Sequence, residues 1–184
     1  MDSGASSYRR YLDGDDDGFV FIINEYMDGL HFYLNSIVGD IYVAEDLTED
    51  TFVKIITKKP RFSGKSSFKT WLYTIGRNIA IDYLKKSKHS AIPIDEISDI
   101  SDDEAILEKE YIRKEDKIFI HRALKRLKPE YHQVLWLIYF EDFTNKEAAI
   151  IMKKSVHNVE TLVYRARHAL KTELEKEGFI YEKS

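Results

Sequence analysis

The sequence TNKEAAIIMKKSVHNVETLVYRARHAL, residues 144–170, contains two helical patterns separated by a short break. Thr144 and Glu147 form a capping box, in which each side chain satisfies a free backbone N–H at a helix start. Apolar residues from 148 to 152 continue this helix for only two turns. Lys153 and Lys154 interrupt it, and Ser155 can cap a longer second helix. The two patterns together predict a helix-turn-helix.

The second helix of this unit is a candidate for DNA binding. Ala149 is small enough to let a second helix pack across it at Val159. In such a unit the second helix enters the major groove, where Asn suits adenine and Glu suits the cytosine amino group. An ordinary helical hairpin remains an alternative, because Lys153 stands where the turn usually has glycine. The candidate DNA-binding residues are Lys154, Ser155, His157, Asn158, Glu160, Thr161, Tyr164 and Arg165.

The N-terminal half contains three further helical patterns. Apolar residues recur every three to four positions over 19–38, 44–56 and 68–83, and the first of these segments is one long helix or two in tandem. Pro60 ends the second helix, and Ser66 or Ser67 can cap the third. These segments predict a small helical bundle.

The predicted fold is all-α, with two helical domains joined by a flexible acidic linker. Small polar residues and a cluster of acids over 1–17 predict a disordered tail, and residues 18–88 form the bundle. Residues 89–104 include Pro93 and lack sustained apolar periodicity, so they form the linker. The second domain covers 105–184 and has helices over 106–127 and 131–140 before the helix-turn-helix.

The charge of the chain is unevenly distributed, although its net value is only -4. Between residues 54 and 88 there are ten Lys and Arg side chains and a single acid, Asp82. Residues 95–110 are strongly acidic. A cationic segment next to an acidic one indicates a local nucleic-acid surface, although a solvated face beside an acidic linker is the alternative.

The composition also narrows the class of protein. Cysteine is absent and the six His residues are scattered, so we expect neither a disulfide nor a metal site, and no motif calls for a cofactor. No apolar run approaches the roughly 18 residues that a transmembrane helix needs. Since the N-terminus has no signal sequence, we expect a cytoplasmic protein without stable membrane insertion.

The segment FSGKSSFKTWLYTIGRN, residues 62–78, mixes aromatic and cationic side chains. Aromatic faces can stack on unpaired bases while cations follow the backbone, which suits single-stranded DNA. Trp71 also has core spacing, so a mainly structural role is equally open. The letters GKS at 64–66 are similar to the end of a phosphate-binding loop, but Lys59 stands at the position of the required first glycine. No signature of a catalytic site is present, so we expect no enzyme.

Taken together, three stretches resemble regions two and four of extracytoplasmic-function sigma factors of the sigma-70 family. They are AEDLTEDTFVKI at 44–55, the segment 62–78 followed by Asp82, Tyr83 and Leu84, and VETLVYRARHAL at 159–170. The resemblance covers nearly the whole chain. It implies a subunit that binds core RNA polymerase and directs transcription initiation at specific promoters.

The resemblance also implies a role for each segment. The helix over 44–55 would bind the β and β′ subunits of the polymerase, the segment from 62 would recognise and melt the minus-10 element, and the helix from Ser155 would read the minus-35 element. An anti-sigma factor is a further expected partner. Implied polymerase contacts are Glu45, Asp46, Leu47, Glu49 and Phe52, and implied minus-10 contacts are Phe62, Ser63, Gly64, Lys65, Ser66, Lys69, Trp71, Arg77, Asn78, Lys85 and Lys86.

Two other classes of function stay open at this level. The C-terminal motif suits an autonomous repressor or activator that would bind a palindromic duplex without polymerase. A nucleotide hydrolase would require phosphate release that depends on Lys65, and the spacing described above disfavours it.

Overall fold

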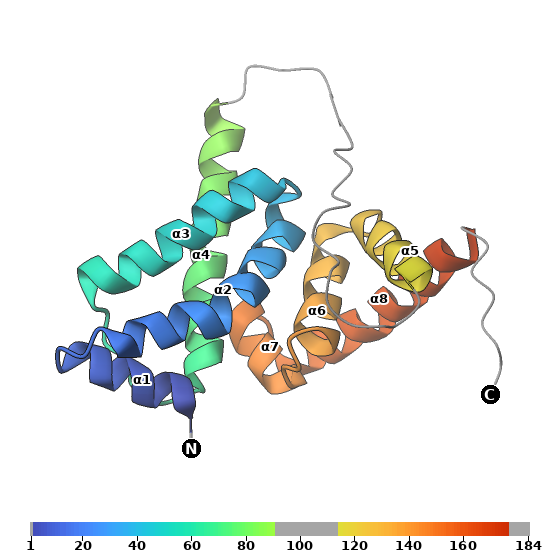
Figure 1. The fold of residues 1–184 in the computed structure, drawn as a ribbon. Helices are drawn as coiled ribbons and strands as arrows, with labels where there is room; N and C mark the ends of the chain where they lie inside the picture. Colours follow the sequence, from blue (N-terminus) through green and yellow to red (C-terminus); the bar gives the residue numbers. More distant parts are fainter. Residues whose placement is uncertain (1, 91–113, 177–184) are drawn as a thin grey trace.

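A computed structural model describes residues 2–90 and 114–176, with side chains over 2–87 and 119–176. Throughout these ranges the regular secondary structure is helical. The helices, shown in Figure 1, are α1 (Ser3–Leu12), α2 (Asp17–Val38), α3 (Ile41–Lys58), α4 (Phe68–Ser90), α5 (Lys114–Lys125), α6 (Pro129–Tyr139), α7 (Asn145–Met152) and α8 (Val156–Lys176).

The N-terminal bundle consists of α1 to α4. Helix α2 is a single helix, and it ends at Gly39, whose φ of 74° is a left-handed conformation that glycine adopts without strain. Asp40 then caps α3 by accepting hydrogen bonds from the N–H groups of Tyr42 and Val43. Ser67 caps α4 through the N–H of Thr70, as predicted. Helices α2, α3 and α4 pack on one another around a core that includes Leu30, Ile55 and Leu72, all fully buried.

The predicted disordered tail is wrong for residues 3–12, which form α1. This helix packs along α2 and contacts α4, and its Tyr8 and Tyr11 are buried. Because its residues are mostly small and polar, this segment lacks the apolar pattern that predicts a helix. The same small residues let α1 pack close to its neighbours. Gly4 and Ser7 are both on the buried side.

The C-terminal unit consists of α5 to α8, with α8 packed on α5, α6 and α7. The predicted helix over 131–140 is α6, which starts two residues earlier at Pro129, where the missing N–H of proline costs nothing. The observed α5 starts at Lys114, and the predicted helical residues 106–113 lie outside the described part of the chain. The same holds for the predicted linker from residue 91 onward, whereas its first residues, 89 and 90, extend α4.

The two halves of the molecule pack directly against each other, α2 on α6 and α4 on α7 (Figure 1). Phe32 of α2 contacts Trp136 of α6, with ring centroids 5.7 Å apart. The structure therefore brings the segment after residue 62 close to the start of the helix-turn-helix.

Candidate nucleic-acid interface

The loop between α3 and α4 presents the predicted single-strand-binding residues in two ways. Ser63, Gly64 and Lys65 are exposed at its tip, and Gly64 has a φ of 71°. Phe62 is half-buried, and its ring packs on Phe68 and Trp71 with centroid distances of 5.7 and 5.3 Å. The tip is thus free to contact a ligand while Phe62 anchors the loop. Ser66, also predicted here, is half-buried.

Trp71 belongs to a packed aromatic group. Its ring lies 5.3 Å from Phe68 and 5.4 Å from Tyr8, in addition to the Phe62 contact. Aromatic pairs at such distances stabilise beyond the area they bury. These contacts support a mainly structural role for Trp71.

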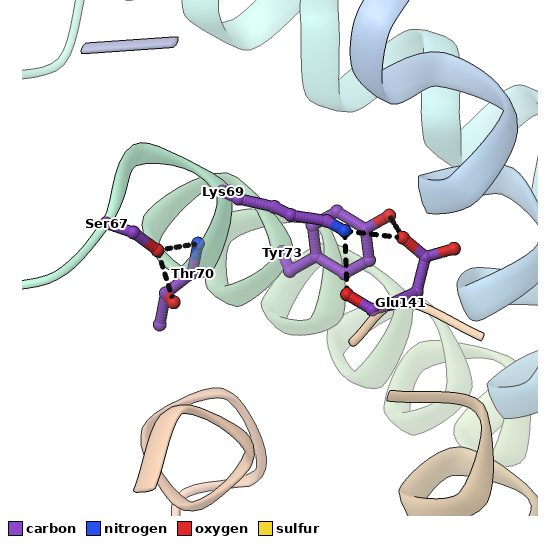
Figure 2. Close-up of polar contacts among 5 residues, drawn as sticks. All are labelled: Ser67, Lys69, Thr70, Tyr73 and Glu141. Atoms are coloured by element: carbon purple, nitrogen blue, oxygen red, sulfur yellow. Dashed lines mark hydrogen bonds and ion pairs between the residues drawn. The ribbon is translucent and has the colours of Figure 1, made fainter. Parts of the chain in front are cut away.

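Lys69 is already engaged by the C-terminal half of the chain (Figure 2). Its Nζ donates to the backbone oxygen of Glu141 at 2.8 Å and pairs with the Glu141 carboxylate at 3.0 Å. The Tyr73 hydroxyl donates to the same carboxylate at 2.6 Å. Burial, with the neighbouring Glu141 charge, raises the pKa of Tyr73 well above its ordinary value, so the hydroxyl stays a donor. In this arrangement Lys69 is not available to a phosphate.

A second carboxylate, Glu147 of α7, joins the two halves next to this pair. It accepts hydrogen bonds from Ser67 and Thr70 of α4 at 3.4 and 3.3 Å, as well as from Thr144 within its capping box. Burial raises the pKa of Glu147, but the hydrogen bonds from Thr144, Thr70 and Ser67 outweigh it, so the net pKa is lowered and Glu147 stays charged. The confirmed capping box therefore also serves the contact between the halves.

The remaining predicted cations on α4 differ in their surroundings. Arg77 is half-buried beside Tyr33, and its Nε is buried without a hydrogen-bond partner in the described structure. Lys85 and Lys86 are exposed near the far end of the helix. Lys85 lies 3.7 Å from Asp82, a solvent-exposed pair of little energetic weight. Asn78 is half-buried.

The outer side of α3 is acidic, as predicted, but two of its assigned residues are not on it. Leu47 and Phe52 are 5% and 3% exposed and belong to the core, which corrects their assignment as contacts. Glu45, Asp46 and Glu49 are exposed. A shallow groove of about 170 Å³ between α2 and α3 is lined by Met27, Asp28, His31, Glu45, Thr48 and Glu49.

The helix-turn-helix forms with the expected packing. Ala149 of α7 and Val159 of α8 are both buried, and Ser155 caps α8 by accepting from the N–H of Asn158 at 3.1 Å. Lys153 adopts the left-handed conformation that the turn requires. On α8 the residues His157, Asn158, Glu160, Tyr164 and Arg165 are exposed, Ser155 before it is exposed too, and Thr161 is half-buried. Lys154 is instead paired with Glu130 of α6 at 3.1 Å.

Metal binding and membrane insertion can be assessed for residues 2–90 and 114–176. Within them, no three His, Asp or Glu side chains come close enough together to hold a metal ion. None of the helices in these ranges combines the length and the apolar character needed to cross a bilayer.

Comparison with known proteins decides the family. The model of sigma-70 region 2 matches residues 22–90, and that of sigma-70 region 4 matches residues 120–170. SigV of Bacillus subtilis, an RNA polymerase sigma factor, is 30% identical over 139 residues, which cover 73% of this chain and 77% of SigV. The chain belongs to the sigma-70 family. SigW of the same organism, an extracytoplasmic-function sigma factor, is 27% identical over 88% of this chain and 91% of its own length.

Two solved structures, one of them a sigma factor, share the fold. RpoE of Bartonella quintana, solved with the anti-sigma factor NepR, gives a TM-score of 0.68 at 24% identity, with 87% of this chain and 98% of that chain covered. CnrH, solved with the cytosolic domain of CnrY, gives 0.67 at 20% identity over 95% and 99% of the two chains. This extracytoplasmic-function sigma factor is thus an alternative sigma factor, a DNA-recognition protein that binds core RNA polymerase and directs promoter-specific transcription.

Several residues of this sigma factor that surround its candidate surfaces were missed by sequence reasoning. Asp28 and His31 of α2 line the groove beside α3, and Glu141 engages Lys69. Asp28 had a detectable signal, because it is one of only three acidic residues on the mainly apolar helix α2 that precedes the acidic one. Glu141 had none, since only the packing of the two halves brings it to α4.

Proposed function

We propose that this sigma factor reads a promoter through two separate surfaces and binds polymerase through a third. The tip of the α3–α4 loop, residues 63–66, together with Lys85 and Lys86, recognises and melts the minus-10 element. The first turns of α8 read the minus-35 element. The acidic side of α3 binds the β and β′ subunits.

The observation that carries this proposal is the chemical difference between these surfaces. The loop tip combines an exposed Lys65 with a left-handed Gly64, and it lies between the helices α3 and α4. The start of α8 exposes Asn158 and Glu160, which suit base edges. The side of α3 exposes only carboxylates over 45–50, which would repel DNA and attract a basic protein.

The acidic groove between α2 and α3 adds to the proposed polymerase surface. Glu45 and Glu49 of α3 face Asp28 of α2 across it. Such a groove suits a basic side chain of the partner, because several carboxylates can share one cation. We propose that Asp28 takes the place that Leu47 and Phe52 held in the sequence-based assignment.

An Asp46→Ala substitution tests the polymerase surface. Asp46 is exposed, so we expect the fold to be preserved while the dissociation constant for core RNA polymerase rises about tenfold, the equivalent of roughly 1.4 kcal/mol. Asp13→Ala is the matched control, because it removes the same charge from the end of α1. Titration of labelled protein with core polymerase measures both. Equal affinities for the two variants would contradict the assignment of α3.

The whole function is tested by adding the purified chain to core RNA polymerase and sequencing the transcripts. We expect start sites that share two upstream elements. Failure to form a complex in gel filtration would contradict the proposal, and tight binding to a palindromic duplex without polymerase would favour an autonomous repressor instead.

We further propose that the protein acts in the cytoplasm and is controlled by an anti-sigma factor. The support is the fold shared with RpoE, whose solved structure contains the anti-sigma factor NepR, and with CnrH, which was solved with the cytosolic domain of CnrY. Affinity purification of the tagged sigma factor before and after stress, read by mass spectrometry, tests this. Recovery of core polymerase alone under all conditions would contradict it.

A further inference from the structure

Helix α1 lies against both ends of the loop that the proposed function assigns to the minus-10 element. The loop leaves α3 at Lys59, which has a left-handed φ of 44°, and it enters α4 at Phe68. Such a connection has no regular ladder of backbone hydrogen bonds, so its conformation depends on anchors at its ends.

The entrance of the loop is held by Tyr8. Its hydroxyl donates to the backbone oxygen of Pro60 at 2.7 Å, and the residue is only 1% exposed. The ring also packs on Phe68 and Trp71, the same two rings that support Phe62. Tyr8 thereby fixes a backbone carbonyl near the start of the loop and completes the aromatic group under the loop.

The exit of the loop is held by Asp2. One carboxylate oxygen accepts from the N–H of Phe68, the first residue of α4, at 2.6 Å. The other accepts from the N–H of Ala5 at 3.0 Å. A single side chain therefore caps two helices, and its negative charge lies at the positive end of both dipoles.

Close packing keeps α1 in this position. A Cβ on Gly4 would lie 2.5 Å from Cδ1 of Phe68 and 2.6 Å from the Tyr26 hydroxyl. A Cβ on Gly18 of α2 would collide with the backbone oxygen of Ser7. These two glycines let α1 approach α2 and α4 closely enough for Asp2 and Tyr8 to reach the loop.

We infer that α1 and its cap act as a clamp that presets the loop for base recognition, with Asp2 and Tyr8 as positioning residues for minus-10 specificity. The clamp lies outside the residues that the sigma-70 region 2 model matches, which begin at 22. Neither residue contacts the DNA itself. Each holds one end of the segment whose tip carries Ser63, Gly64 and Lys65.

The inference rests on the proposed role of the loop, and Tyr8→Phe tests it. This change removes the hydroxyl bond to Pro60 and keeps the ring. Tyr11→Phe is the matched control on the same helix, because the Tyr11 hydroxyl lies 3.4 Å from the backbone oxygen of Ile56, inside α3 rather than in the loop. Asp2→Ala tests the other end, with Asp13→Ala as its charge control.

The measurement uses holoenzyme assembled from the full chain and core polymerase. It selects from a pool of promoter fragments randomised over the minus-35 and minus-10 regions. For Tyr8→Phe and Asp2→Ala we expect discrimination among minus-10 sequences to fall about five- to tenfold, while minus-35 preference and affinity for core polymerase stay as in the wild type. Both controls should select like the wild type.

Two results would overturn the clamp. One is unchanged minus-10 discrimination in both variants. The other is an equal loss of polymerase binding and of both preferences, since α1 would then support the domain as a whole. If the wild-type holoenzyme itself selects no minus-10 sequence, the proposed function of the loop fails, and that failure is distinct from either result.

Discussion

Lys153 adopts a left-handed conformation, with φ 55° and ψ 47°, between the two helices of the helix-turn-helix. A residue with a Cβ pays roughly 1–2 kcal/mol for this conformation, whereas glycine adopts it freely. A Lys-to-Gly change would therefore remove this strain from the folded state. It would also raise the conformational entropy of the unfolded chain, which lowers the gain in stability by about 0.4–1 kcal/mol. We therefore expect Lys153→Gly to raise the free energy of unfolding by about 0.5–1 kcal/mol in denaturant titrations.

Lys146 provides the control for that substitution. It is exposed in the first turn of α7, where the backbone is right-handed. Lys146→Gly should lower the free energy of unfolding by up to about 1 kcal/mol. If both substitutions destabilise the protein equally, strain at Lys153 is not significant.

At the scale of a helix, α6 carries a histidine that stays neutral. Burial, with a smaller contribution from the nearby charges of His121 and Lys125, lowers the pKa of His132 to about 4 from an ordinary 6.5. Between these values the unfolded chain binds a proton that the folded chain does not. Stability should therefore fall as the pH drops from 6.5 to 4, with a slope of up to about 1.4 kcal/mol per pH unit from this group.

Thermal unfolding between pH 4 and pH 7 measures this dependence. In His132→Gln the slope over the window should be smaller, because the titrating group is gone. His157→Gln removes an exposed histidine from α8 and should keep the wild-type slope. A wild-type slope in His132→Gln would assign the acid sensitivity to other groups.

The helices that could be predicted are those with local signals. The capping box of Thr144 and Glu147 and the cap at Ser155 involve residues within three positions of each other, so they are visible in the sequence. Helix α1 depends on contacts that span more than 40 residues, such as Tyr8 to Pro60, and its composition resembles a tail. Leu47 and Phe52 were misplaced because a motif match does not separate the buried side of a helix from its exposed side.

At the scale of the whole molecule, the two halves meet through Glu141. A Cβ on Gly29 of α2 would lie 2.7 Å from both carboxylate oxygens of Glu141 and 2.5 Å from the Tyr73 hydroxyl. The missing side chain thus leaves the space that Glu141 occupies. We expect Gly29→Ala to displace Glu141 and to weaken the packing of the halves by about 1.5–3 kcal/mol, the range for hydrogen bonds to charged groups.

The packing of the two halves can be measured by energy transfer between two dyes. Because the chain has no cysteine, one cysteine introduced on α3 and one on α8 can carry these dyes. Transfer efficiency should fall in Gly29→Ala and also in Glu141→Ala, which leaves the N-terminal core untouched. Combining the two should add little, because both act on the same contact. Additive effects would show that Gly29 acts on the N-terminal bundle alone.

The chain contains two tryptophans, one under the α3–α4 loop and one at the junction of the two halves. Trp71 is in the aromatic group under the loop, whereas Trp136 is stacked on Phe140 and touches Phe32 across the junction of the halves. Ultraviolet emission from each indole, seen singly after replacing the other by phenylalanine, would then distinguish two events. One indole would register a nucleotide arriving at the loop, and the other the parting of the two lobes, in unlabelled protein and in real time.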